Sequence, residues 1–358
     1  MLGIVALGAT VVIVSGGIDL SAGSVMAFGG AICASIIVAL VDKNARGLPV
    51  TSDVPLWIIS LALAGTLLVG FLIGTFHAWL ITVIGLPPFV ATLASLVGLR
   101  SLGRVIVQDV NAAVSATGSS TDIQIADARF RAMGEVWWIP LLIFLVLSAL
   151  CWVLMSRTVV GRHLYAMGGN ENAARLSGIR TDRLKWLAYC LSAMTASMAG
   201  VLVTGFVSKA SPATASAGFE LNAIAAAVVG GCSLQGGIGT IFGTMLGALF
   251  LQTVINSVGK IIKTTPDDFQ GLIVGILVVL AVAFNELRGS GGLQKRFFPG
   301  ALGVLNGAIL SGLAAVISAA IARTGKLQVG IVVGTAVAVL VGVRWMLERR
   351  AETEKFST

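Results

Sequence analysis

The sequence has few charged residues. Only 11% of its 358 residues are Asp, Glu, Lys or Arg, whereas soluble globular proteins average about 25%. This scarcity argues against an ordinary soluble protein. Hydrophobic residues instead make up 56% of the chain, which has a mean hydropathy of +0.96 and contains 44 glycines. Such a composition is typical of helices that pack closely in a lipid bilayer.

Motifs for catalysis and for ATP hydrolysis are missing. The sequence contains no G-x-x-x-x-G-K-[ST] phosphate loop, no H-E-x-x-H motif and no nucleophile elbow. Its two histidines, His77 and His163, are isolated, which favours ordinary hydrogen-bonded residues over metal ligands. We therefore expect no catalytic residue, no metal site and no cofactor in this chain, and the net charge of +8 need not indicate nucleic acid binding.

The cysteines form no disulfide framework or metal-ligand pattern. They are far apart, lie in apolar runs and include no C-x-x-C pair; they are Cys33, Cys151, Cys190 and Cys232. We expect them to act as small apolar fillers.

Apolar runs predict an all-α, polytopic membrane protein with about eleven transmembrane helices. A span needs about 20 residues, so eleven spans would take about 220 and leave no room for a large soluble domain. The runs of suitable length cover residues 1–15, 22–41, 56–84, 88–107, 136–155, 186–207, 221–235, 237–258, 269–285, 298–322 and 328–347.

The distribution of basic residues predicts the orientation, because Lys and Arg are retained on the cytoplasmic side. One loop, residues 156–185, is especially basic; it contains Arg157, Arg162, Arg175, Arg180, Arg183 and Lys185. Counting spans from this loop also places three basic residues of the segment 286–296 and three of the tail inside; they are Arg288, Lys295, Arg296, Arg349, Arg350 and Lys355. Lys43 and Arg46 fall outside, against the rule. No basic residue precedes Lys43, so we expect a membrane segment rather than a cleavable signal peptide at Met1.

Two glycine-broken segments resemble each other. Six residues, Gly16, Gly17, Leu20, Gly23, Phe28 and Gly29, recur at an offset of 214 as Gly230, Gly231, Leu234, Gly237, Phe242 and Gly243. Paired short, glycine-interrupted membrane segments point to a transport pathway. The span count makes the two copies parallel, and one miscounted helix would make them inverted.

One carboxylate, that of Asp19, lies at membrane depth in the first segment. An ionisable group there should cap a helix, pair with another group or face water. The simplest role for Asp19 or Ser21 is to cap the helix that begins near Ala22; contact with a transported solute is the alternative. Glu220 and Asn222 are expected to cap a later span or to line the pathway. The candidate pathway residues are Gly17, Asp19, Ser21, Gly23, Asn222, Gly231, Ser233 and Gly237.

These segments carry a resemblance to a known family. The stretch Gly16-Gly17-Ile18-Asp19-Leu20-Ser21-x-Gly23-Ser24, together with residues 88–93, 161–179, 220–226 and 230–237, resembles the permease subunits of ribose-type ABC sugar importers, within the broader family that includes branched-chain amino acid permeases. The likeness covers residues 1–288, which we interpret as the permease domain. Residues 289–358 form an extension with an apolar hairpin that turns near Arg323, and with a charged tail.

The resemblance implies partners and a cytoplasmic contact. It implies an ATPase subunit that binds ATP inside, an extracytoplasmic sugar-binding protein outside, and a second permease copy or paralogue in a bacterial inner membrane. It assigns ATPase coupling to a short helix in the basic loop and to residues on either side of that helix. The assigned residues are Gly161, Arg162, Gly168, Asn170, Ala173, Ala174 and Gly178. The residues themselves predict this helix, because Asn170 can cap it, Glu171 suits its first turn and Gly178 can end it. The resemblance also implies a further helix before the span that opens at Met1, and we expect its absence here to reflect a misplaced start or a true loss.

The function expected from the sequence is a monosaccharide permease that works by alternating access, with the regions near Asp19 and Ser233 reshaping a central path. A nucleoside or a branched-chain amino acid is an alternative cargo. A different class, a gradient-driven secondary transporter, would need a titratable site in the membrane, for which Asp19 is the candidate.

Overall fold

The computed structural model describes residues 1–45, 47–114, 120–214, 216–261, 266–289, 300–321 and 325–356. Four basic residues used in the sequence analysis lie outside these ranges; they are Arg46, Lys295, Arg296 and Arg323.

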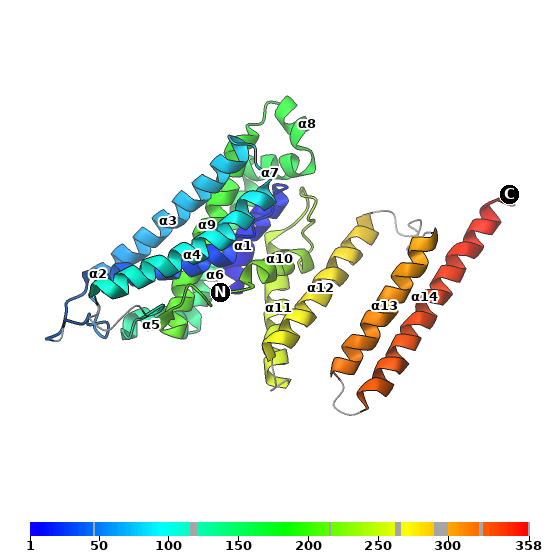
Figure 1. Cartoon of the computed structure of the whole chain (residues 1–358). Coiled ribbons are helices and arrows are strands. Elements are labelled where there is room, and N and C mark those ends of the chain that lie inside the picture. The colour runs from blue at the N-terminus through cyan, green and yellow to red at the C-terminus, as the bar shows by residue number, and fades with distance from the viewer. Residues whose placement is uncertain are drawn as a thin grey trace. The chain divides into compact units, whose positions relative to one another are not determined.

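The chain forms two compact units, Met1–Asn285 and Glu286–Thr358, and its described residues are almost entirely helical (Figure 1). The helices are α1 (Leu2–Val14), α2 (Ala22–Leu40), α3 (Leu56–Thr82), α4 (Pro88–Val114), α5 (Ala128–Glu135), α6 (Trp138–Arg157), α7 (Val159–Gly169), α8 (Glu171–Leu176), α9 (Thr181–Val207), α10 (Phe219–Val229), α11 (Ile241–Ile261), α12 (Pro266–Gly289), α13 (Gly300–Ile321) and α14 (Lys326–Phe356). The strands are β1 (Ile123–Gln124) and β2 (Lys209–Ala210).

The predicted polytopic helical class is confirmed. Within the described residues, seven helices are long and apolar enough to cross a membrane: α2, α3, α4, α6, α9, α11 and α14. Four further helices contain shorter apolar stretches, namely α1, α10, α12 and α13. Two of these shorter helices, α1 and α10, belong to the two glycine-broken segments of the first unit.

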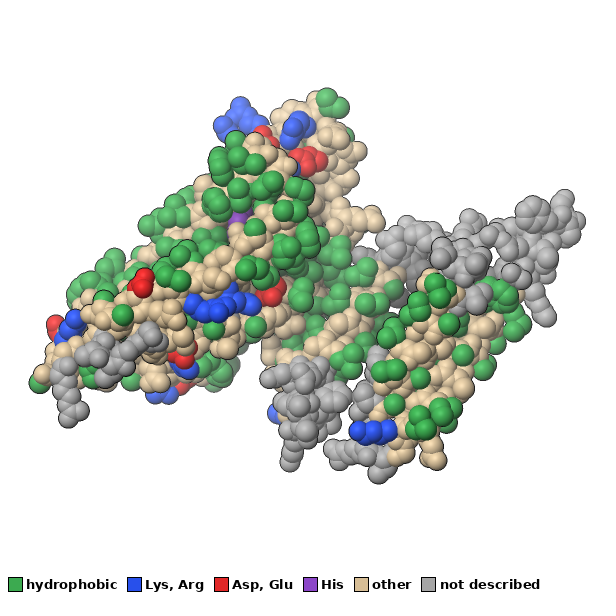
Figure 2. Space-filling model, viewed as in Figure 1, with side chains coloured by type: hydrophobic (Ala, Val, Ile, Leu, Met, Phe, Trp, Pro, Cys, Tyr) green, Lys and Arg blue, Asp and Glu red, His purple; other side chains and the backbone are tan. Residues whose placement is uncertain are grey.

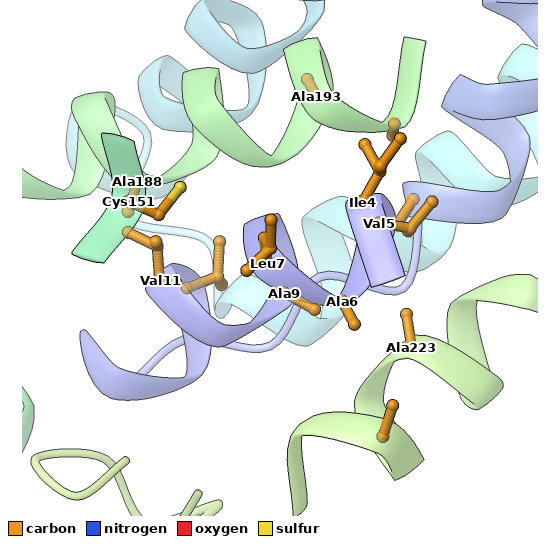
Figure 3. Packing of buried hydrophobic residues seen from close by; sticks show 14 of the residues in the cluster. Ile4, Val5, Ala6, Leu7, Ala9, Val11, Cys151, Ala188, Ala193 and Ala223 are labelled. Carbon is orange, nitrogen blue, oxygen red and sulfur yellow. The ribbon is translucent and has the colours of Figure 1, made fainter. Parts of the chain in front are cut away.

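The core of the first unit is built around α1. All but one of its 13 residues are buried, and its side chains meet Cys151 of α6, Ala188 and Ala193 of α9 and Ala223 of α10 (Figure 3). Helix α9 packs against α1, α2 and α3. Small residues at these contacts allow the close approach that holds helices together in lipid. The four cysteines are buried and free, as expected.

Helices α3, α4 and α6 form the outer layer of this unit. Less than a third of each hydrophobic stretch is buried, and α3 exposes Leu61, Leu68 and Leu72. Figure 2 shows hydrophobic side chains spread over this surface. An exposed apolar surface of this size is suited to lipid or to another protein, because soluble monomers rarely leave such patches uncovered.

The two ends of the first unit differ. Helix α8 projects from one end, and α5 lies at the opposite end (Figure 1). At the α5 end, β1 pairs antiparallel with β2, and the buried Asp127 side chain accepts hydrogen bonds from the backbone N–H groups of Val54 and Phe130, both at 2.8 Å. The predicted orientation makes the α8 end cytoplasmic and the α5 end external.

In the second unit, α13 packs against α14. Gly330 and Gly334 of α14 lie against Ala315 of α13, where an added Cβ would come within about 3 Å of neighbouring atoms. Glycine therefore permits close packing of this helix pair.

Candidate coupling and translocation site

Helices α1 and α10 end in the same glycine turn. Gly16 has a φ of 83° and Gly231 a φ of 93°, in the left-handed region that glycine adopts without strain. The amide of Gly17 donates to the carbonyl of Val12, and that of Cys232 donates to Ala227, each at 3.0 Å. This hydrogen bonding is the glycine-terminated helix ending expected where a chain must leave a helix sharply.

The ungapped offset of 214 is wrong at this turn. Gly16 is structurally equivalent to Gly231 rather than Gly230, and Gly17 to Cys232, so the offset there is 215. The following loops also differ in length, residues 15–21 against residues 230–240. The repeat is therefore one of local structure. Each copy consists of a short helix, a glycine turn and a second helix.

The two glycine-broken pairs run in the same direction. Met1 at the start of α1 and Phe219 at the start of α10 line one cavity, and Ile13 and Ala227 near the helix ends share one apolar cluster. Helix α11 returns antiparallel to α1, because Thr244 near its start bonds Thr10 at 2.7 Å, while Gln252 and Asn256 further along it line the same cavity as Met1. The parallel arrangement given by the span count is thus the one observed.

Asp19 holds the first broken loop in place. Its carboxylate is buried, with 2% of the residue exposed. One oxygen accepts from the amide of Ser21 at 2.8 Å and from its hydroxyl at 2.5 Å, and the other accepts from the hydroxyl of Ser192 on α9 at 2.6 Å. Thr92 of α4 bonds the backbone of the same loop, accepting from the amide of Leu20 at 3.2 Å. Two membrane helices therefore anchor this loop through side chains.

The helix-capping hypothesis for Asp19 and Ser21 is wrong. Ser21 is the N-cap residue of α2, yet no side chain there accepts a capping hydrogen bond. Asp19 instead closes a turn inside the loop through Ser21 and accepts a hydrogen bond from Ser192 of α9. Ser192, which lies 173 residues further along the chain, had no signal in the sequence.

Two further buried polar residues, Tyr189 and His77, lie near the Asp19 loop. Tyr189 of α9 lies against Gly17, where an added Cβ would come 2.6 Å from the tyrosine hydroxyl oxygen. His77 of α3 faces the ring of Tyr189, with ring centroids 6.3 Å apart. Both nitrogens of His77 are buried without a hydrogen-bond partner, so its interpretation as a hydrogen-bonded helix residue is wrong.

The candidate pathway residues in the second half of the chain do not gather at one site. Glu220 is buried in the first turn of α10, whose N-cap is Gly218 without a side-chain cap, and it lies against Gly23. Asn222 is half-buried on the same helix and is not among the side chains that bond the Asp19 loop. Ser233 lies in the second loop, where its amide donates to Ile238 at 2.9 Å. The expectation that Glu220 or Asn222 caps this helix is therefore wrong.

The basic loop contains two helices where the sequence predicted one. Residues 159–169 form α7, whose N-cap Thr158 accepts from the amide of Gly161 at 3.1 Å. Helix α8 has the predicted features: Asn170 accepts from the amide of Ala173 at 2.9 Å, Glu171 is in the first turn, and Gly178, with a φ of 82°, follows its end.

Ion pairs fix α8 to the start of α9. Glu171 pairs with Lys185 at 2.6 Å and with Arg175 at 3.4 Å, and Arg175 also lies 3.5 Å from Asp182. Leu176, the last residue of α8, is 90% exposed. A single exposed apolar side chain is common on protein surfaces, and here it leaves the end of α8 accessible from solvent.

Of the seven predicted coupling residues, the two alanines face different ways. Ala173 is exposed, whereas Ala174 is buried in the main apolar cluster. Arg162 is exposed on α7, and Gly161 is packed against the backbone of α6. Ala174 therefore belongs to the fold of the loop and not to its outer surface.

Gly168, at the end of α7, brings the predicted coupling segment against both broken loops. A Cβ there would overlap the carbonyl oxygen of Val14 and come 2.6 Å from the amide nitrogen of Gly237. That amide donates to the same Val14 carbonyl at 2.9 Å, and Gly236 lies against Gly16. We call the contact of Gly16, Gly168, Gly236 and Gly237 the glycine junction.

The first unit is thus a polytopic helical bundle with two glycine-broken helix pairs joined to a projecting helix. A family model described as branched-chain amino acid transport system / permease component matches residues 1–282. The chain belongs to this family, and it is a multi-pass permease of the bacterial inner membrane. Among the described residues, no group of three or more His, Cys, Asp or Glu is placed to hold a metal ion.

Relatives with known names are similar over most of their length. The chain is 35% identical over 289 residues to the ribose import permease protein RbsC of Escherichia coli K12, covering 80% of this chain and 82% of that protein. It is 34% identical over 290 residues to RbsC of Bacillus subtilis, with coverage of 80% and 81%. It is 32% identical over 285 residues to the D-allose transport system permease protein AlsC of E. coli K12, with 79% of each covered. No solved structure matches the chain.

Proposed function

We propose that this chain is the permease subunit of a binding-protein-dependent ABC importer that carries a monosaccharide. The names of the similar ribose and allose permeases support a sugar as the cargo. An ATPase would bind at the α8 end, a sugar-binding protein at the α5 end, and a second copy or a related permease would complete the pathway.

The observation that carries this proposal is the glycine junction. The exposed helix α8 follows α7 after a single extended residue, Asn170, and α7 ends in van der Waals contact with both broken loops. Tyr165 of α7 adds a hydrogen bond to the carbonyl of Gly239 in the second loop at 2.8 Å. Movement of α8 by an ATPase would therefore act on both loops at once, as alternating access requires.

Reconstitution tests the function. The chain is placed in proteoliposomes with its ATPase and binding protein, and uptake of labelled ribose, allose, leucine and uridine is measured. We expect ATP-driven uptake of a sugar. Uptake of leucine or uridine alone would show that the cargo is an amino acid or a nucleoside and not a sugar. Uptake on an ion gradient without the ATPase would contradict the ABC mechanism. Transport with this chain as the sole permease would indicate a homodimer.

Two substitutions test the surface of α8. Ala173→Glu and Leu176→Asp place a charge on its exposed side, and we expect each to abolish ATPase binding and uptake while the thermal unfolding midpoint is unchanged. Leu176→Met is the matched control, because it keeps an apolar side chain, and it should transport normally. Normal uptake by both charged variants would remove the coupling role from α8.

A further inference from the structure

Two arginines lie inside a membrane span. Arg100 is next to the midpoint of the 27-residue helix α4, and Arg104 lies one turn further on. The Nε and Nη2 atoms of Arg100 are buried without a hydrogen-bond partner, whereas Arg104 is exposed. Neither forms a salt bridge within the described part of the chain.

This position is incompatible with contact to lipid tails. At 1.5 Å per residue, Arg100 lies about 18 Å from the start of α4, near the centre of a span of about 40 Å. A charged side chain at that depth costs about 2.5–3.5 kcal/mol on insertion scales, so such residues face water or polar groups. Helix α3, which exposes Leu61, Leu68, Leu72 and Phe76, has the apolar surface that lipid requires.

A carboxylate lies near the same part of the bundle. Glu220 is 7% exposed, and its Oε2 atom has no hydrogen-bond partner. It lies against Gly23 in the first turn of α2, while Ser24, the next residue, meets α4 at the carbonyl of Ser95, 3.4 Å away. Gly103 of α4 contacts Pro212, in the segment that leads to α10. Arg100 and Glu220 thus belong to neighbouring elements around the start of α2.

We infer that Arg100 and Arg104 line the translocation pathway and that their guanidinium groups donate hydrogen bonds to the hydroxyl oxygens of a polyhydroxylated solute. Glu220 supplies an acceptor for the solute's hydroxyl protons. The inference deepens the proposed function and rests on it. A guanidinium carries five donors and no acceptor, so it suits a solute that presents several oxygen acceptors. In Figure 2, Lys and Arg side chains interrupt the hydrophobic surface part of the way along the visible face.

Thiol accessibility tests the location independently of the cargo. Arg104→Cys and Val97→Cys, two turns apart on one side of α4, are compared in membranes with Leu72→Cys on the apolar face of α3. The reagent is a charged, water-soluble methanethiosulfonate, and the wild-type chain, whose cysteines are buried, gives the baseline. Because the thiolate forms in water, we expect the α4 thiols to react about tenfold or more faster than the α3 thiol. Equal rates would place α4 against lipid and overturn the inference.

Transport kinetics test the role. Arg100→Gln and Arg104→Gln should lower sugar uptake by about tenfold or more each, which corresponds to loss of one charge-assisted hydrogen bond. ATPase activity stimulated by the binding protein should stay within about twofold of the wild type, and Arg104→Lys should recover part of the uptake. Unchanged uptake in both Gln variants, with reactive α4 thiols, would overturn the hydrogen-bonding role alone. If the wild type carries no sugar while the α4 thiols react, the proposed function fails and the pathway location stands.

Discussion

At the scale of single residues, Asp19 shows how a charge at membrane depth is stabilised within the chain. Both carboxylate oxygens accept hydrogen bonds, one oxygen two from Ser21 and the other one from Ser192. A carboxylate with both oxygens engaged in this way positions the loop in which it lies. The arrangement therefore favours a structural role for Asp19 in its loop over the ion site that a gradient-driven secondary transporter would need.

Asp19→Ala should destabilise the chain by about 2–4 kcal/mol, because a buried amide and two hydroxyls lose their acceptor. Ser192→Ala removes one donor and should cost about 1 kcal/mol, in the range of single hydrogen bonds between membrane helices. The measurement is thermal or denaturant unfolding in detergent. Equal effects of the two substitutions would show that the Ser21 hydrogen bonds do not hold the loop.

Asp122, at the α5 end, provides a prediction for the effect of pH. Burial by itself raises the pKa of this carboxyl group, but hydrogen bonds from Lys209 and Ser211 and the charge of Lys209 bring its pKa below the usual value. The Asp122–Lys209 ion pair has an N–O distance of 2.6 Å. A lowered pKa means that the folded state prefers the ionised carboxylate.

The stabilisation from Asp122 is therefore fully present above the unfolded-state pKa of about 3.9 and is lost as the pH falls through it toward the lowered value. The difference in unfolding free energy between the wild type and Asp122→Asn should be constant from about pH 5 to pH 8 and should shrink below about pH 4. Lys209→Gln should flatten this dependence. A difference that does not change with pH would contradict the assignment.

At the scale of elements, the glycine junction joins the coupling segment to both broken loops, and it has a built-in control. Gly168→Ala adds a methyl group that overlaps the Val14 carbonyl, and overpacking of this kind costs about 1–3 kcal/mol. Gly169 is adjacent, and a Cβ there meets nothing within 4 Å. We expect Gly168→Ala to lose most sugar uptake while ATP hydrolysis continues, and Gly169→Ala to match the wild type. Coupled uptake by Gly168→Ala would show that the junction does not transmit movement.

The elements that the sequence predicted well are those set by neighbouring residues. Asn170, Glu171 and Gly178 define α8 through contacts within a few residues, and such chemistry can be read directly from the sequence. Helix α7 was missed because three of its 11 residues are glycine, which is typical of a loop. Its helical form depends on packing of Gly161 against the backbone of α6, a contact between elements.

The candidate site was predicted in its parts and not in its assembly. Glycine patterns located both broken loops, but the sequence could not show that Gly168 lies between them. The orientation of Ala174 into the core likewise follows from the fold. Arg100 and Arg104 were overlooked within an apolar run, although their charge in a predicted span was a visible signal.

At the scale of the whole molecule, the two units differ in their relation to the family. The family match ends at residue 282 and the first unit at Asn285. Among the described residues, the three clusters of buried apolar side chains all lie in the first unit. The second unit contains its own packed pair, α13 and α14. We propose that the first unit carries transport and that the second is an accessory extension.

Removal of residues 290–358, which leaves α12 complete, tests this division. We expect the shortened chain to insert in the membrane, to bind the ATPase and to import sugar at a rate within about twofold of the full chain, because the buried contacts around the glycine junction and Asp19 are retained. Its unfolding midpoint should shift by no more than a few degrees, about the effect of 1 kcal/mol for a chain of this size. The comparison uses equal amounts of both proteins in the same proteoliposomes. If uptake is lost while the unfolding midpoint and ATPase binding are kept, the extension takes part in transport, and the function belongs to both units together.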